Sequence, residues 1–211
     1  MTRPLLIIGA GGHGTVVLDA ARVAGLTVLG LADADPARRG TRVLGAPVIG
    51  DDDDVLAQDP AEVLLVLGIG STADTARRRS VYDKFKDREY SFATVRHPSA
   101  VVAEDARIGA GTVVMAGAVI QPRCRIGENV IVNTGARIDH DGAVEDHVHV
   151  APGAVLSGNV ALGAGAHVGV GATVLQGVTV GADAVCGAGA VVIRDVAAGR
   201  TVVGNPARET L

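Results

Sequence analysis

A six-residue repeat runs without a break through the second half of the chain, and it limits the fold more than any other feature of the sequence. From Val102 onward, every sixth residue is aliphatic, with a single cysteine as the exception. The series is Val102, Ile108, Val114, Ile120, Ile126, Val132, Ile138, Val144, Val150, Leu156, Leu162, Val168, Val174, Val180, Cys186 and Val192. The fourth place of each hexapeptide holds Gly, Asn or Asp, apart from Arg123 and His147. Because these three residue types tolerate a positive φ best, the pattern predicts a corner in every hexapeptide.

Such a period predicts short parallel strands wound around a triangular core, with three hexapeptides in each coil. The distribution of large aromatic residues supports a narrow core, since no Phe, Tyr or Trp follows residue 92. The chain has only four aromatic residues, which are Tyr82, Phe85, Tyr90 and Phe92. A region without Phe, Tyr or Trp must fill its interior with Val, Ile, Leu and Ala. We therefore expect an α/β domain over residues 1–96 and an all-β parallel β-helix with a C-terminal tail over residues 97–211.

The first ninety residues predict half of a nucleotide-binding fold. An apolar strand over 5–8 leads into Gly9-Ala10-Gly11-Gly12-His13-Gly14, followed by a helix to about residue 24, a strand over 27–31 and then Asp33. This order resembles the dinucleotide-binding fingerprint, in which glycines let backbone N–H groups approach a phosphate and the acid binds ribose. A third strand over 63–67 and a helix over about 72–85 follow, with no second mononucleotide half. The layout therefore favours a site that binds a single nucleotide, and binding of the dinucleotide NAD stays the competing interpretation.

Charge and composition narrow the partners. The formal net charge of −4 argues against nucleic acid, which needs clustered Lys and Arg. The short basic run Arg77–Arg79 falls in a predicted helix and is interpreted as a solvated face. No long apolar run predicts a membrane span, no signal-peptide pattern is visible, and Cys124 and Cys186 occupy apolar repeat positions as expected for buried free thiols. A cytoplasmic protein is expected. The acidic run Asp51–Asp54 is interpreted as a helix start rather than a cation site.

The positions of the histidines in the repeat indicate different roles for them. His140 stands between two carboxylates in Asp139-His140-Asp141, on a wall with few other charges. A carboxylate beside an imidazole fixes its tautomer and raises its basicity, as a general base near neutral pH requires. His149 and His167 are 18 residues apart, so they are expected to stack on adjacent coils, where either could cap the face or touch a ligand.

The combination of a short Gly-Ala-Gly-Gly-His-Gly nucleotide domain, a His97-Pro98-Ser99-Ala100 join and a hexapeptide region resembles the PglD/NeuD family of sugar acetyltransferases. The run Val132–Asp141 is similar to the family's approach to its catalytic His and acid. The resemblance implies a left-handed β-helix, which the period alone does not fix. It also implies a homotrimer and transfer of acetyl from acetyl-CoA, without metal, to a UDP- or GDP-linked amino sugar, with a 4-amino-deoxy sugar as the expected acceptor.

The same resemblance assigns roles to residues of this chain. It makes His140 the base and Asp141 its partner, where the family usually has Glu. It places His149, Gly158, Val170 and Ala188 against acetyl-CoA, with the Gly158 N–H toward the thioester oxygen. It places the sugar nucleotide against a further set, which is Gly11, Gly12, His13, Asp33, Ala34 and Gly70.

Three alternatives remain. The first is O-acetylation of sialic acid, because one His–carboxylate pair could activate either nucleophile. The second is a metal enzyme resembling the γ-carbonic anhydrases, whose site needs three imidazoles, with one about 36 residues before another. The residues 36 positions before His140, His147, His149 and His167 are Glu104, Gly111, Val113 and Ile131, none of which is His. The third is a scaffold or regulator that has kept the fold, which only a turnover measurement separates from an enzyme.

Overall fold

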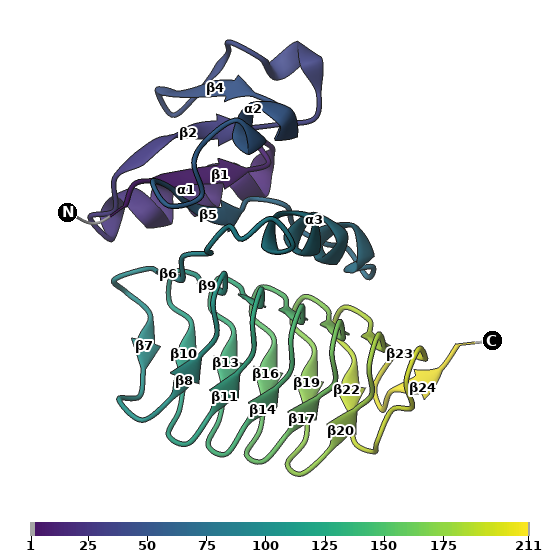
Figure 1. Cartoon of the computed structure of the whole chain (residues 1–211). Coiled ribbons are helices and arrows are strands. Elements are labelled where there is room, and N and C mark those ends of the chain that lie inside the picture. Colours follow the sequence, from purple (N-terminus) through teal and green to yellow (C-terminus); the bar gives the residue numbers. More distant parts are fainter. Residues whose placement is uncertain (1–2, 211) are drawn as a thin grey trace.

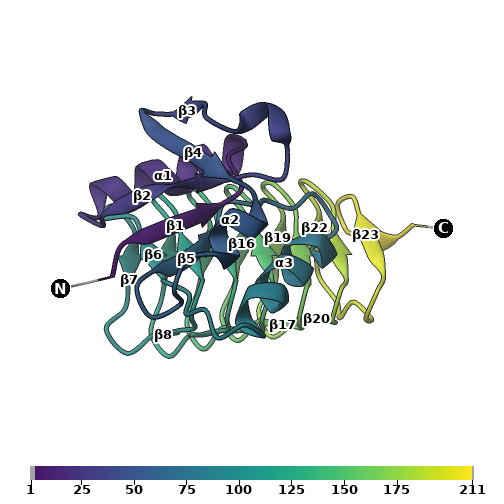
Figure 2. The same ribbon diagram turned by 45° about the horizontal axis from the view of Figure 1, so that its top comes forward.

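The computed structural model describes residues 3–210 and contains two parts (Figure 1). An α/β part from the beginning of the chain lies along one side of a long parallel β-helix, which forms the rest of the molecule. Figure 2 shows that the α/β part covers much of the length of the β-helix. No helix within residues 3–210 is both long enough and apolar enough to cross a membrane.

The α/β part is built on one five-stranded sheet in the order β3-β4-β2-β1-β5. Its elements are β1 (Leu5–Ile8), α1 (Gly12–Val23), β2 (Val28–Ala32), the 3-10 helix η1 (Pro36–Arg38), β3 (Arg42–Val43), β4 (Ala46–Gly50), α2 (Asp52–Leu56), β5 (Leu64–Leu67) and α3 (Ala76–Lys86). Strand β1 pairs in parallel with both β2 and β5, as its central place requires. Strands β1, β2 and β5 and helices α1 and α3 confirm the sequence prediction. The β3–β4 hairpin and η1 were not predicted.

The acidic run forms a helix start, as the sequence predicted. Asp51 is the N-cap of α2, and its side chain accepts hydrogen bonds from the N–H groups of Asp53 and Asp54. The side chain of Asp54 returns a bond to the Asp51 N–H, which completes a capping box. Backbone bonding, led by the Asp53 N–H, holds the pKa of Asp51 below its ordinary value. The acidic side chains are therefore accounted for by the helix that they begin.

The β-helix has three sheets, here called sheets I, II and III. Sheet I contains β7 (Val101–Val102), β10 (Val119–Ile120), β13 (Arg137–Ile138), β16 (Val155–Leu156), β19 (Thr173–Val174) and β22 (Val191–Val192). Sheet II contains β8 (Arg107–Ile108), β11 (Arg125–Ile126), β14 (Ala143–Val144), β17 (Ala161–Leu162) and β20 (Thr179–Val180). Sheet III contains β6 (Val95–Arg96), β9 (Val113–Val114), β12 (Ile131–Val132), β15 (His149–Val150), β18 (His167–Val168), β21 (Val185–Cys186), β23 (Thr201–Val203) and β24 (Arg208–Glu209).

The six-residue frame defines the interior of this left-handed parallel β-helix. Ile120 pairs with Ile138, and Ile138 pairs with Leu156, so repeat positions one coil apart stack in a column. Cys124 and Cys186 are buried free thiols in the same core, as predicted. The backbone has a positive φ at each fourth-place corner from Gly111 to Gly189, including both exceptions to the residue pattern. The corner conformation is thus a property of the coil, and a side chain larger than Gly can occupy it.

The two parts share a hydrophobic core along sheet III. Val17 and Leu18 of α1 pack in one buried cluster with Val113, Met115 and Ile131 of the β-helix. Strand β6, immediately before the join, already pairs with β9. Because this core spans both parts, the α/β part is fixed to sheet III rather than tethered beside it.

Arg78 corrects the prediction of a solvated basic face on α3. Its side chain is only 1% exposed, and it donates to the carbonyl oxygens of Leu67, Ile69 and Asn129. Burial lowers the pKa of Arg78 to about 9. Its neighbour Arg79 forms an ion pair of 2.6 Å with Asp183. Arg78 and Arg79 therefore join the two parts of the molecule, because α3 lies against the β-helix, whereas Arg77 is exposed as predicted.

Candidate active site

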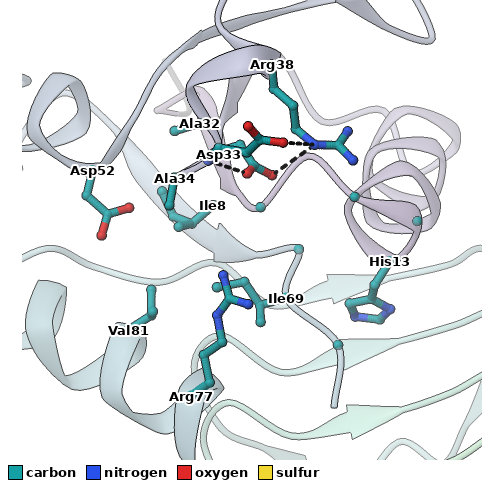
Figure 3. Close-up of a pocket in the computed structure, with 16 residues that line it drawn as sticks. Ile8, His13, Ala32, Asp33, Ala34, Arg38, Asp52, Ile69, Arg77 and Val81 are labelled. Atoms are coloured by element: carbon teal, nitrogen blue, oxygen red, sulfur yellow. Dashed lines mark hydrogen bonds and ion pairs between the residues drawn. The ribbon is translucent and has the colours of Figure 1, made fainter. Parts of the chain in front are cut away.

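A cavity of about 460 Å³ opens at the carboxyl edge of the N-terminal sheet, beside the beginning of α1 (Figure 3). It brings together all six residues that sequence analysis assigned to the nucleotide sugar, which are Gly11, Gly12, His13, Asp33, Ala34 and Gly70. Further lining residues were missed, including Asp35, Arg38, Asp52 and Arg77. In Figure 3, Arg38, Arg77 and Asp52 surround the cavity with charges of both signs. The only signal in the sequence for these four residues was their position, either just after a strand or on a helix beside the carboxyl edge of the sheet.

The glycine motif shapes the floor of this cavity. Gly9 has a φ of 106°, which favours glycine, and a Cβ at Gly14 would collide with the Gly9 carbonyl. A Cβ at Gly11 or Gly12 would meet nothing within 4 Å, so the backbone there faces open space. Helix α1 begins at Gly12 with no acidic residue in its first turn. Free N–H groups at a helix N-terminus facing an open cavity form an arrangement that suits a phosphate.

Asp33 organises the cavity wall. One carboxylate oxygen accepts the Ala10 N–H at 2.7 Å, and the other accepts the Asp35 N–H at 3.0 Å. Arg38 donates to the Ala10 carbonyl at 2.9 Å and lies 3.9 Å from the carboxylates of Asp33 and Asp35. The acid therefore ties the glycine loop to the end of β2.

His13 lies at the inner end of the cavity. Its Nε2 is buried and has no hydrogen-bond partner within residues 3–210. Burial, helped by the charge of Arg78, lowers the pKa of His13 to about 4, so the ring is neutral at pH 7. Gly70 lies against this side chain, since a Cβ there would be 3.5 Å from the ring atom Cγ of His13. A neutral imidazole with an unused nitrogen is suited to hydrogen bonding with a bound ligand.

His140 and Asp141 form a pair on the corner between sheets I and II. The Nδ1 atom of His140 lies 2.7 Å from Asp141 Oδ2, and 48% of the imidazole side chain is exposed. Asp141 also binds Arg123 through both of its oxygens, at 2.6 and 2.8 Å. These bonds, first from Arg123 and then from His140, hold the pKa of Asp141 well below its usual range. Sequence analysis missed Arg123, although its place one coil before Asp141, in a slot that usually holds Gly, was a signal.

Gly158 lies one coil beyond His140 and leaves room for its ring. A Cβ at Gly158 would be only 2.6 Å from His140 Nε2. The next residue, Asn159, donates its N–H to the His140 carbonyl at 2.8 Å, which aligns the two coils. The Gly158 N–H itself has no acceptor among the described residues. The structure thus places an unused donor beside the imidazole.

A second cavity, of about 410 Å³, follows the edge of sheet III and contains the three remaining residues predicted to contact acetyl-CoA. Val170 and Ala188 line it on adjacent coils, together with His149. Residues 71–73 of the loop after β5 close one side, so the same loop borders both cavities. His149 and His167 stack on adjacent coils, as predicted, with ring centroids 5.0 Å apart.

The hydrogen bonds of His149 fix it as a neutral ring. Its Nδ1 donates to the Ser71 carbonyl at 3.1 Å, and its Nε2 accepts from the Asn133 amide at 3.0 Å. Burial is the main cause that lowers the pKa of His149 to about 3, with contributions from His167, His13 and Arg78. Both nitrogens are therefore used within the protein. By contrast, Nδ1 of His167 is buried without a partner in the described part of the chain.

The two cavities and the His140–Asp141 pair lie on different sides of the chain. Both cavities adjoin sheet III or the α/β part above it, whereas His140 is on the corner formed by the other two sheets. In a triangular coil, that corner is opposite sheet III. Among residues 3–210, no group of three or more His, Cys, Asp and Glu side chains is arranged to hold a metal ion.

The fold and these features define an α/β domain with an open cavity, joined to a hexapeptide β-helix. Family models match both parts: a PglD N-terminal domain over residues 4–85 and a bacterial transferase hexapeptide over residues 97–140. Comparison with curated proteins finds no match.

Solved structures extend the match to the whole chain. A mutant form of perosamine N-acetyltransferase from Caulobacter crescentus, in complex with CoA and GDP-perosamine, is 39% identical over 100% of this chain and 98% of its own, with a TM-score of 0.92. The acetyltransferase domain of PglB from Neisseria gonorrhoeae, in complex with acetyl coenzyme A, is 38% identical over 100% of both chains, also with a TM-score of 0.92. WeeI from Acinetobacter baumannii is 27% identical over 99% of this chain and 100% of its own, with a TM-score of 0.81. The chain belongs to the family of PglD-like sugar acetyltransferases.

Proposed function

We propose that this protein transfers the acetyl group of acetyl-CoA to the amine of a nucleotide-linked amino sugar, with a UDP- or GDP-linked 4-amino-deoxy sugar as acceptor. The observation that carries this proposal is the presence, in one chain, of an open nucleotide-type cavity and an exposed His140–Asp141 pair above Gly158. The full-length likeness to an enzyme bound to CoA and GDP-perosamine supports both substrates.

His140 is the proposed general base. Because the ionised Asp141 only accepts hydrogen bonds, His140 must donate from Nδ1, and its Nε2 then carries the free electron pair. Nε2 takes a proton as the amine nitrogen attacks the thioester carbonyl carbon. The Gly158 N–H stabilises the oxyanion. When the carbon–sulfur bond breaks, its electron pair goes to sulfur, and His140 returns the proton to the departing thiolate.

Direct transfer without an acyl-enzyme suits the state of the two cysteines. Burial raises the pKa of the Cys186 thiol to about 11 and also raises that of Cys124, so neither is a ready nucleophile at neutral pH. The Cys124 thiol donates to the Asp139 carbonyl at 3.1 Å, on the inner side of the corner between sheets I and II. A ternary complex therefore needs only the His140 side chain and the backbone beside it.

The cavity along sheet III fits the pantetheine arm of acetyl-CoA. Its wall is mainly apolar side chains and backbone at the coil edges, including Val170 and Ala188, which suits a narrow and mostly uncharged chain. The unpartnered Nδ1 of His167 offers a hydrogen bond within this wall. His149 shapes the cavity with its ring, while its own bonds hold the Ser71 loop in place.

The N-terminal cavity is the proposed site for the sugar nucleotide. The N–H groups at Gly11 and Gly12 would bind the diphosphate, supported by the positive charge of Arg77. Asp33, Ala34 and Gly70 form the adjoining wall, and the free Nε2 of His13 would bond the ligand at the inner end.

We further propose a homotrimer in which a neighbouring subunit supplies His140. One chain places this residue on the corner opposite sheet III, whereas one cavity lies along sheet III and the other in the α/β part packed on it, so ligands bound in them require the base of another copy. Cyclic symmetry would repeat the same contact at every interface and give equivalent sites.

The decisive experiment measures CoA release with acetyl-CoA and a panel of UDP- and GDP-linked 3- and 4-amino sugars, with sialic acid as the competing acceptor. We expect turnover with a nucleotide-linked amino sugar. His140→Ala should reduce it by roughly 10²–10⁴-fold, the usual contribution of a general base, and should leave the unfolding midpoint unchanged because the side chain is half exposed. Turnover with sialic acid alone would replace the proposed acceptor. Normal turnover by His140→Ala would remove the proposed base.

A further inference from the structure

Arg123 connects the proposed base to the preceding coil. Its Nε donates to Asp141 Oδ1 at 2.6 Å, and its Nη2 donates to Asp141 Oδ2 at 2.8 Å. The second of these oxygens also receives the Nδ1–H of His140 at 2.7 Å. A guanidinium that binds both oxygens of a carboxylate fixes the plane of that carboxylate, which a single point charge does not.

The coil geometry explains how this contact arises. Arg123 and Asp141 occupy equivalent corners 18 residues apart, with φ values of 62° and 61°. The Arg123 N–H donates to Asp105 Oδ2 at 3.1 Å, and the Asp141 N–H donates to the Pro122 carbonyl at 3.1 Å. Side chains at stacked corners therefore follow one another along the edge of the helix. Both residues occupy slots where most coils have Gly or Asn, which provide no such side chain.

The Asp141 carboxylate needs this second contact. It is short, partly exposed and attached to a corner of the backbone, so water competes for its oxygens. If the carboxylate rotated, the Nδ1–H of His140 would lose its acceptor, and the proton could move to Nε2. The imidazole would then present a donor, rather than an electron pair, toward Gly158.

We propose that Arg123 is a positioning residue, which orients the Asp141 carboxylate and thereby keeps His140 in the Nδ1–H tautomer required of a base. This inference deepens the proposed function and rests on it for the kinetic consequence, whereas the tautomer itself is a property of the free protein. Arg123 touches neither reacting atom in this scheme and acts through Asp141.

The charges around His140 also give Arg123 an electrostatic effect. Asp139 and Asp141 flank the imidazole on its own corner, Arg123, Arg125 and the Cys124 thiol lie one coil earlier, and Asp105 lies two coils earlier. Residues 157–159 of the following coil carry no titratable side chain. The Arg123 guanidinium is the positive group bound to the same carboxylate as the imidazole, so without it the negative charge of Asp141 is left uncompensated beside His140. Its removal should move the acidic limb of the kcat profile to higher pH.

The test compares Arg123→Gln with Arg123→Lys. The first replacement removes both the positive charge and the two parallel hydrogen bonds to Asp141, whereas the second keeps the charge but cannot form the two parallel bonds. Both replacements retain a Cβ at the positive-φ corner, and Arg107→Gln is a matched control at an exposed arginine one coil earlier on sheet II. We expect Arg123→Gln to lower kcat roughly tenfold, with KM values within about twofold of wild type. It should also shift the acidic limb upward. The acidic limb of Arg123→Lys should stay at the wild-type pH while its kcat is intermediate.

An activity-independent measurement separates this inference from the proposed function. Nitrogen-15 NMR of histidine-labelled protein, with the His140 signals assigned from His140→Gln, reports which ring nitrogen carries the proton. We expect the Nδ1–H form in wild type and Arg107→Gln, and a mixture in Arg123→Gln. A tautomer change in a protein without acetyltransferase activity would support the positioning role and refute the proposed reaction. An unchanged tautomer and pH profile in Arg123→Gln would overturn the inference, even if turnover were normal in wild type.

Discussion

At the scale of single residues, the histidines separate by environment. His140 is half exposed and bonded to an ionised carboxylate, whereas His149 is 6% exposed and uses both ring nitrogens within the protein. The sequence indicated both positions, and the flanking acids distinguished His140. It could not reveal that Ser71, 78 residues earlier, would occupy Nδ1 of His149, because that bond depends on how the two parts pack.

The buried neutral state of His149 predicts a loss of stability in mild acid. Unfolded chain takes up a proton at this residue below pH 6.5, whereas the folded protein does so only near pH 3. The unfolded state thus binds more protons across this window, so the free energy of unfolding falls as pH falls, by about 1.4 kcal/mol per pH unit for this one group. Urea unfolding at fixed protein concentration, at pH 7.5 and pH 5.5, measures the difference.

The variant for this test is His149→Gln, whose amide can both donate and accept but does not titrate. We expect its stability to fall by about 1.4 kcal/mol less than wild type between the two pH values. An identical fall in both proteins would show that His149 is not held neutral in the folded state. His13 and His167, whose pKa values are also lowered, should account for part of the remaining acid sensitivity.

At the scale of elements, the column of aliphatic residues maintains the β-helix. Ile138 is fully buried and stacks between Ile120 and Leu156 in the apolar core of the β-helix. We expect Ile138→Asp to cost several kcal/mol, because a carboxylate would enter an apolar column, and to give insoluble or unfolded protein. Ile138→Val is the matched control, with a cost of about 1 kcal/mol. Solubility and thermal unfolding report the result, and a soluble, cooperatively folded Ile138→Asp would show that this frame does not define the interior.

The sequence predicted these elements to different extents for physical reasons. The period of six was unbroken, so the stacking of Ile138 on its neighbours followed directly. The β3–β4 hairpin and η1 have no comparable period and depend on the sheet edge that they complete. Arg78 looked like a surface charge because local sequence contains no information about the carbonyl groups of β5 and the neighbouring coil that surround it. Arg123 was an exception within the repeat, and its partner became identifiable only once the coils were stacked.

At the scale of the whole molecule, the two cavities belong to different parts of the chain and should fail separately. A Val side chain at Gly11 would enter open space and leave the fold intact, since a Cβ there meets nothing within 4 Å. It would nevertheless block the approach of phosphate to the backbone. We expect Gly11→Val to abolish binding of UDP, GDP and the sugar nucleotide, measured by calorimetry, while acetyl-CoA binding is unchanged. Val16→Ala, at an exposed position of the same helix, is the control. Tight NAD binding by wild type, lost in Gly11→Val, would favour the dinucleotide interpretation of this domain.

The proposed trimer makes a stronger prediction about how the parts cooperate. If the cavity of one subunit uses His140 of another, two inactive variants should restore each other when they assemble together. A productive site then needs its cavity from a His140→Ala subunit and its base from a Gly11→Val subunit. With random mixing of equal amounts, this combination occurs at about one quarter of the sites, so coexpressed protein should recover roughly a quarter of wild-type activity. The two variants purified separately and mixed without exchange provide the baseline, and light scattering gives the oligomeric state. Coassembled trimers with no activity above that baseline would mean that each chain completes its own site.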